Sequence, residues 1–312
     1  MIKINKKLIK KGHKIIKEEG LLVFLKKSIF LFFNLLKELF HNYIHLKYLL
    51  LFSFNEEITK EIQGNKMILD LKDRGISREL ALYGVHEKAS TEQIKKLLAP
   101  GMKIVEIGAN IGYYLLMEAK LIGKEGYIYA FEPSPYNLNL LRRNINLNNY
   151  HNVEIHQKAV GSQNKKAKFY IANRSNLSGF IKRENMKYMY RNDGDDIIKV
   201  DVIKLDNFLK EKKIDLIRMD IEGFEKEALK GMETVLSGKN PPRYFFIEVH
   251  SKLLHKKNSS GGEIVKYMER FGYLVIKSFF GGRVDIAVSS TQKLLKHPRL
   301  EKGYWETFFQ HK

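Results

Sequence analysis

Cysteine is absent from all 312 residues of the chain. Its absence excludes structural disulfides, thiolate metal sites and a cysteine nucleophile. The chain also lacks a run of about 20 uncharged apolar residues, the length that a bilayer-spanning helix needs. No internal repeat is visible. Since 44% of the residues are hydrophobic, the chain can still bury a full-sized core.

Negative charge is scarce, and the formal net charge is +20. A basic excess can indicate nucleic acid or a lipid surface as partner. Most of the excess is Lys, however, whereas Arg is the better reader of phosphates and bases. No RNA- or DNA-reading motif accompanies the charge. We therefore expect that nucleic acid is not the partner.

The first 52 residues combine eleven Lys and three Glu with an apolar pattern of helical spacing. Lys26 and Lys27 interrupt the apolar segment and no small-residue cleavage site follows, so a secretory signal fits poorly. Three interpretations stay open for residues 1–52: contact with an anionic membrane surface, pairing with another helix, or packing on the chain's own domain.

From residue 66 onward, short apolar segments alternate with helical patterns, which predicts an α/β domain with a mostly parallel, doubly wound sheet. Expected strands cover 66–71, 103–107, 127–131, 153–160, 168–172, 197–203, 215–219, 244–249, 273–278 and 284–288. Expected helices are 90–98 capped by Ser90, 111–122, a segment capped by Ser134, a segment around 228–232, and 263–271. We expect three parts: a basic amphipathic helical extension (1–64), the α/β domain (65–290) and a C-terminal tail (291–312).

A glycine-rich turn, Glu106–Gly112, follows the first strong strand. Gly108 and Gly112 allow a tight turn, and Asn110 tolerates unusual backbone angles. The following helix start offers free N–H groups to a carboxylate, and Glu106 is placed to hold an ammonium group. The spacing G-x-N-x-G lacks the central glycine of the dinucleotide fingerprint, which favours a cofactor without a diphosphate.

Glu132 ends the next strand, about 20 residues beyond the glycines, where an acid can accept hydrogen bonds from both ribose hydroxyls. Together with the glycine turn, it predicts binding of S-adenosylmethionine. Asp220 and Glu222 emerge from a later apolar strand, and His250 ends another. All three are candidate catalytic bases.

We rank Asp220 first, because partial burial raises a carboxyl pKa toward neutrality. His250 is second, with an ordinary pKa near 6.5, and Glu222 is third. We expect no metal: His41 and His45 have helical metal-ligand spacing, but no third ligand lies near in sequence.

Six motifs occur in an order that resembles the FkbM-type methyltransferases over residues 66–290. They are Glu106–Gly112 with Tyr113-Tyr114, Ala130–Pro133, Lys158–Gly161, Leu205-Asp206, Met219–Gly223 and Glu248–His250. The resemblance implies the class I methyltransferase fold, a seven-stranded Rossmann-like sheet with one antiparallel strand near an edge. It also implies methyl transfer from S-adenosylmethionine to an oxygen.

The resemblance assigns roles by position. Glu106, Gly108, Asn110 and Gly112 would line the methionine end, Glu132 would hold the ribose, Ala159 and Val160 would flank the adenine, and Glu87 would close the site. Asp220 and Glu222 would face the methyl group and the acceptor. Tyr113 is placed to offer an aromatic face to the sulfonium, with core packing as the alternative.

The expected acceptor is a hydroxyl of a sugar, glycan, polyketide or lipid-linked molecule. The alternatives are an RNA methyltransferase and a non-catalytic, membrane-peripheral protein that binds nucleosides. We expect a cytoplasmic location. If residues 1–52 contact a membrane, that membrane surface is expected to be the inner face. The polar segment 173–192 is expected to contribute to acceptor recognition.

Overall fold

The chain divides into two units, Met1–Asn55 and Glu56–Lys312. The computed structural model describes residues 56–172, 174–182, 197–210, 212–281 and 283–312, together with scattered positions between 20 and 46. The second unit begins with an antiparallel hairpin of β1 (Glu57–Ile62) and β2 (Asn65–Asp70). The hairpin begins eight residues before the boundary expected at 64/65. Strand β1 alternates between exposed and partly buried residues, as an edge strand does, and therefore has no apolar run to mark it in the sequence.

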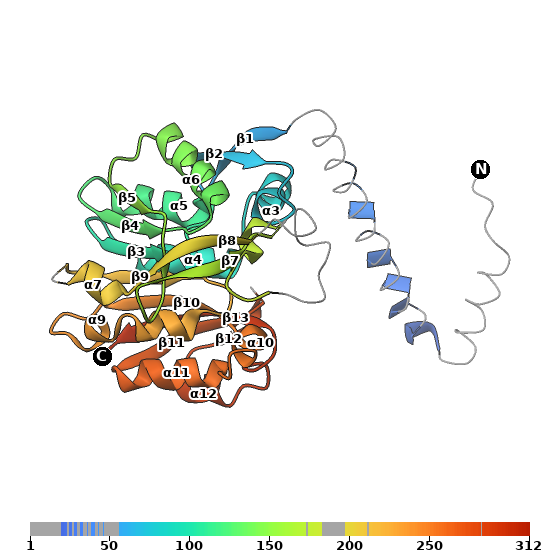
Figure 1. Cartoon of the computed structure of the whole chain (residues 1–312). Helices are drawn as coiled ribbons and strands as arrows, with labels where there is room; N and C mark the ends of the chain where they lie inside the picture. Colours follow the sequence, from blue (N-terminus) through green and yellow to red (C-terminus); the bar gives the residue numbers. More distant parts are fainter. Residues whose placement is uncertain are drawn as a thin grey trace. The chain divides into compact units, whose positions relative to one another are not determined.

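The second unit is built on an eight-stranded sheet, which Figure 1 shows running from the green β5 to the red β12. In spatial order its strands are β12 (Arg283–Val288), β11 (Tyr273–Phe280), β13 (Tyr304–His311), β10 (Tyr244–His250), β9 (Leu216–Met219), β3 (Lys103–Ile107), β4 (Tyr127–Phe131) and β5 (Val153–His156). Strands β5, β4, β3, β9 and β10 are parallel. The chain runs outward from β3 through β4 to β5 and then returns to β9, so strand order reverses between β3 and β9.

Strand β13 is the main departure from the expected sheet. It lies antiparallel between β10 and β11, inside residues expected to form a tail over 291–312. Its residues 305–309 are buried in succession, and Trp305, Phe308 and Phe309 are fully enclosed. With β12 at the edge, the sheet has eight strands rather than seven.

A second, three-stranded sheet consists of β6 (Ala159–Val160), β8 (Ile197–Ile203) and β7 (Lys165–Tyr170). The single strand expected over 153–160 therefore divides: β5 joins the large sheet, and β6 pairs with β8. Gln157 and Lys158 separate the two strands, and the Lys158 N–H donates a 2.9 Å hydrogen bond to the backbone oxygen of His156. This division carries Ala159 and Val160 away from β5 toward the cofactor side of β8.

Helices connect the strands. They are α3 (Ile76–Tyr83), α4 (Lys88–Leu97), α5 (Tyr113–Ile122), α6 (Pro135–Leu147), α7 (Leu205–Leu209), α8 (Glu225–Lys230), α9 (Glu233–Ser237), α10 (Ser251–His255), α11 (Gly261–Arg270), α12 (Thr291–Leu295) and the 3₁₀ turn η1 (Ser175–Leu177). Ser134 caps α6 as expected, accepting a hydrogen bond from the Asn137 N–H. Ser90 does not cap α4: that helix already begins at Lys88, and Ser90 is buried within it.

The described positions of the first unit between residues 21 and 46 are helical. Their large apolar side chains are exposed, including Leu22 at 75% and Phe33 at 63%. The expected helical stripe is therefore present at these positions, while residues 1–19 and 47–55 lie outside the described residues. Within the described part of the chain, no helix combines the length and apolarity needed to cross a bilayer.

Candidate active site

The glycine-rich turn after β3 requires left-handed backbone angles at three positions. φ is +86° at Gly108, +49° at Asn110 and +96° at Gly112. A Cβ on Gly108 would lie 2.0 Å from the backbone oxygen of Asp220, and one on Gly112 would lie 2.7 Å from Leu141. The glycines therefore allow the turn to pack on the end of β9 and on α6. Their first role is contact within the protein.

Glu132, at the end of β4, is tied to that turn. Its carboxylate accepts hydrogen bonds from the backbone N–H of Asn110 and of Ser134, both at 2.8 Å. Its residue is 4% exposed. Burial raises the pKa of Glu132, the two backbone donors lower it in part, and the result is about 7. A carboxylate poised in this way has lone pairs left for the hydroxyls of a ribose.

A cleft opens at the carboxyl ends of β3, β4 and β9, where strand order reverses. This is where open α/β sheets bind ligands. The cleft brings together seven of the predicted site residues: Gly108, Asn110, Glu132, Ala159, Val160, Asp220 and Glu222. Phe169 and Phe180, from and after β7, add an aromatic wall that the sequence did not indicate.

Glu106 lies outside this cleft. It is 1% exposed, and its Oε1 accepts a hydrogen bond of 2.6 Å from Arg218 of β9. The guanidinium of Arg218 also lies 3.8 Å from the ring centroid of Tyr114 and 3.4 Å from Asp220. Glu106 therefore has a cation partner within the protein, where we expected a ligand ammonium group.

Glu118 of α5 shares this buried environment. Burial raises its pKa well above the ordinary value, and the Glu106 carboxylate raises it further. A neutral Glu118 can donate a hydrogen bond to Glu106, so that Arg218 is balanced by one carboxylate there. The arrangement fixes Arg218 beside Asp220 at the end of β9.

The structure places Glu87, Tyr113 and Gly112 around the cleft rather than in its lining. Glu87 accepts a hydrogen bond of 2.9 Å from the Tyr114 hydroxyl. The Tyr113 hydroxyl lies 3.0 Å from Thr91 Oγ1 and donates to the backbone oxygen of His86. Tyr113 is 3% exposed, which agrees with the packing alternative.

His250, at the end of β10, sits among carboxylates. Its Nδ1 lies 2.9 Å from Glu225, and its Nε2 lies 3.3 Å from Glu222 and 3.6 Å from Glu248. Burial alone would lower the pKa of His250, but Glu222 and Glu225 raise it to about 10. With its pKa raised in this way, His250 carries a proton at neutral pH. A histidine already protonated at pH 7 is a poor base.

Several residues at this site were not predicted. Arg218, Glu225 and Glu248 belong to motifs read in the sequence, but their roles depend on contacts between distant strands. Asp73 carries no motif at all. Its carboxylate accepts 2.9 Å hydrogen bonds from the N–H and the hydroxyl of Ser175, which lines the cleft.

The polar segment 173–192 is partly described. Ser175, Asn176, Ser178 and Phe180 line the cleft. Residue 173 and residues 183–196 lie outside the described residues. The expected role of this segment in acceptor recognition remains a proposal.

The strand order, with β13 antiparallel between β10 and β11, and the cleft at the switch point define a class I methyltransferase. The family model described as the methyltransferase FkbM domain matches residues 106–275, more than half of the chain. The chain belongs to the FkbM methyltransferase family. The description of the matched model is that of a methyltransferase domain.

Known proteins resemble the chain over part of its length. Methyltransferase 1 of Beauveria bassiana is 32% identical over 146 residues, 42% of this chain and 58% of that protein. A protein-L-isoaspartate O-methyltransferase of Methanothrix thermoacetophila is 36% identical over 58 residues, 19% of this chain and 28% of that protein. The chain thus matches less than two thirds of either relative. A SAM-dependent methyltransferase structure from Aquifex aeolicus aligns with 72% of this chain and 92% of its own, at 16% identity and a TM-score of 0.39.

Proposed function

We propose that the chain transfers a methyl group from S-adenosylmethionine to a hydroxyl oxygen of a sugar, glycan, polyketide or lipid-linked acceptor. The supporting observation is the position of Asp220 and Glu222, two carboxylates that line the cofactor cleft at the end of β9. An alkyl hydroxyl is too weak an acid to ionise freely near neutral pH, so transfer to oxygen needs a proton acceptor. Carboxylates supply one.

In the proposed reaction, the acceptor oxygen forms a bond to the methyl carbon as the carbon–sulfur bond breaks. The products are the methyl ether and S-adenosylhomocysteine, and the hydroxyl proton passes to a carboxylate. Asp220 is the first candidate, because its side chain is 21% exposed and therefore reachable. Arg218 lies 3.4 Å from one Asp220 oxygen and orients the carboxylate. The protein's main contribution is alignment of the two reacting groups.

The charge around Asp220 supports a small acceptor over RNA. Glu222, Glu225 and Glu248 surround His250 beside it, so this end of the cleft carries excess negative charge. A polyanion would be repelled there. The net charge of +20 is consistent with nonspecific RNA binding elsewhere on the surface, whereas among the described residues that line the cleft Lys158 is the one cation, beside the carboxyl groups of Glu132, Asp220 and Glu222.

Asp220→Asn tests the proposed proton transfer. The variant keeps the size of the side chain and removes its basicity, so the rate of methyl transfer to a hydroxyl acceptor should fall roughly 10²- to 10⁴-fold. Affinity for S-adenosylmethionine, measured by calorimetry, should change only a few-fold. Formation of S-adenosylhomocysteine measures turnover. A near-normal rate would remove Asp220 from this role. Methylation of nitrogen alone would overturn O-methyl transfer, and methylation of RNA alone would overturn the proposed acceptor class.

We also propose that the first unit attaches the enzyme to an anionic membrane surface. The support is the exposed apolar set at its described helical positions, next to a Lys-rich sequence. An amphipathic helix of this kind can bury apolar side chains at the headgroup boundary while Lys contacts anionic lipids. The enzyme would then be cytoplasmic, on the inner face of the membrane, close to lipid-linked acceptors.

A further inference from the structure

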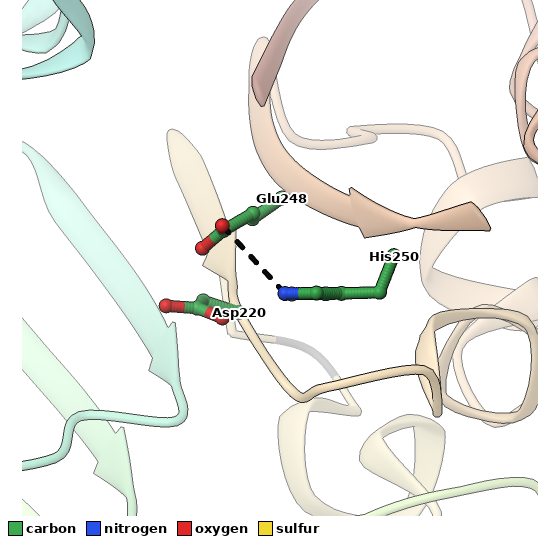
Figure 2. Close-up of side chains that lie close together, drawn as sticks. All are labelled: Asp220, Glu248 and His250. Atoms are coloured by element: carbon green, nitrogen blue, oxygen red, sulfur yellow. Dashed lines mark ion pairs between the residues drawn. The ribbon is translucent and has the colours of Figure 1, made fainter. Parts of the chain in front are cut away.

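Asp220, Glu248 and His250 come from two neighbouring strands of the sheet. Asp220 follows β9, and Glu248 and His250 lie two residues apart on β10, so their side chains emerge on the same face. One ligand-type atom from each lies within 4.8 Å of the other two. Figure 2 shows the three side chains gathered at the ends of these strands, with Glu248 and Asp220 facing His250.

Glu248 provides a second observation that points to a bound cation. Its residue is 7% exposed, so its carboxyl group is largely removed from water. Its recorded contact is the 3.6 Å ion pair with His250 Nε2, drawn as a dashed line in Figure 2. A buried carboxyl group normally has hydrogen-bond partners. The side chain is directed at the cluster.

The histidine is oriented as metal-binding histidines are. Its Nδ1 lies 2.9 Å from Glu225 Oε1, and Glu225 is fully buried and also accepts from the Gly223 N–H. A carboxylate at Nδ1 fixes the ring and turns Nε2 toward the ligand position. Nε2 is the atom that faces Glu222 and Glu248.

Electrostatics favour a cation at the same place. Glu248 is buried, and one carboxylate oxygen from each of Glu87, Glu248 and Glu306 lies within 4.8 Å of the other two. Glu306 of β13 lies opposite Glu248 in the strand register and adds another buried carboxyl group. Carboxylates crowded in this way repel one another, and a divalent cation relieves that repulsion.

We propose that Asp220, Glu248 and His250 bind one divalent cation, of the Mg²⁺ or Mn²⁺ type, at the acceptor end of the cleft. Two carboxylate oxygens and one imidazole nitrogen leave coordination positions for oxygen atoms of the acceptor. The cation displaces the proton from Nε2 of His250. The sequence alone favoured a metal-free site because no third ligand was near His41 and His45; this triad involves neither of them.

The functional role of the cation rests on the proposed O-methyl transfer. A hydroxyl bound to a divalent cation loses its proton more readily. With the cation bound, Asp220 is a ligand instead of the proton acceptor, and Glu222, which also lines the cleft, receives the proton in its place. The cation thus orients the hydroxyl toward the sulfonium methyl and increases its acidity.

The test is a titration of the full chain with MnCl₂, followed by electron paramagnetic resonance. We expect one bound Mn²⁺ per chain. Glu248→Gln, which keeps the shape and removes the charge, should weaken binding at least tenfold, as should Asp220→Asn. The matched control is Glu92→Gln, a partly exposed acid of α4 that pairs with Lys95 and should bind Mn²⁺ as the wild type does. Affinity for S-adenosylmethionine and circular dichroism check folding.

Two outcomes overturn the proposal: no Mn²⁺ bound to the wild type at millimolar concentration, or normal binding by both cluster variants. Because Mn²⁺ binding is measured without acceptor or turnover, the result is separate from the proposed function. A chain that binds Mn²⁺ in the cluster but methylates nitrogen would keep the metal site and lose O-methyl transfer. A chain that methylates hydroxyls without binding Mn²⁺ would keep O-methyl transfer and overturn the metal site.

Discussion

Single residues at the cleft show how a local motif depends on distant contacts. Gly108 is required because the backbone oxygen of Asp220, from another strand, occupies the space where a side chain would begin. A Cβ there would therefore disturb the end of β9 even without a cofactor. Arg218 likewise links Glu106 of β3 to Asp220 across the sheet. The residues of the site are thus coupled through β9.

Glu132 carries a pH-dependent prediction. Its pKa is raised to about 7 by burial, so the group is a carboxylate at pH 8 and largely protonated at pH 6. Since only the carboxylate accepts hydrogen bonds from both ribose hydroxyls, affinity for S-adenosylmethionine should fall as the pH decreases through about 7. Calorimetry at pH 6 and pH 8 measures this difference.

Glu132→Gln should weaken cofactor binding by roughly 1.5–3 kcal/mol at pH 8, the scale of hydrogen bonds to a charged group. The variant should also lose most of the pH dependence, because the amide does not titrate. Glu92→Gln, outside the cleft, should follow the wild type. A folded Glu132→Gln protein with unchanged affinity would contradict the assignment of Glu132 to the ribose.

At the scale of elements, β13 joins β11 and the edge strand β12 to the parallel part of the sheet. It separates β10 from β11, and Glu306, Thr307 and Phe308 are fully buried. The residues after 290 lacked an obvious α/β pattern, because β13 is continuously buried and has no alternation to indicate its face. Its partners are also earlier in the chain, so nothing local indicates its position.

Phe308→Ala tests how much β13 contributes to the free energy of unfolding. The Phe308 ring stacks on Phe246 of β10 with centroids 4.2 Å apart, so truncation leaves a cavity inside the sheet layer. The free energy of unfolding should fall by roughly 3–5 kcal/mol in urea denaturation. Leu274→Ala, at a 38% exposed position of β11, should cost much less. Equal losses in the two variants would contradict a central role for β13.

At the scale of the whole molecule, the two units differ in kind. The second unit encloses its apolar residues around the sheet, with Phe245, Ile247 and Met219 at under 1% exposure. The described apolar positions of the first unit are exposed. Exposed large apolar side chains that gather in one segment are unusual unless they bind something. Because Lys residues are abundant in the same segment, we propose an anionic lipid surface as the partner.

The full chain should therefore bind vesicles containing anionic lipid at low salt and release them as ionic strength increases. Phe33→Asp should weaken co-sedimentation about tenfold, because a charge then enters the apolar face. Ser28→Asp is the matched control for charge at another exposed position of the same segment, and should lose less. Failure of the full chain to bind such vesicles would favour the coiled-coil or packing interpretation.

The sequence by itself determined the parts whose signals are local. The β3 strand, the glycine turn, Glu132 at the end of β4 and the cap at Ser134 all depend on periodicity, backbone freedom or turn chemistry within a few residues. The predicted cofactor-binding residues that line the cleft follow from these signals, because parallel strands end at one edge of the sheet.

The tertiary structure alone decided what depends on contacts between distant strands. Arg218 reaches Glu106 across 112 residues of sequence, so the acid expected to hold a ligand is neutralised within the protein. His250 becomes strongly basic because Glu222 and Glu225 enclose it, and Glu248 joins Asp220 only when β9 and β10 pair. The pKa of a group and the geometry of a cation site depend on charges brought together in space, which no local pattern in the sequence encodes.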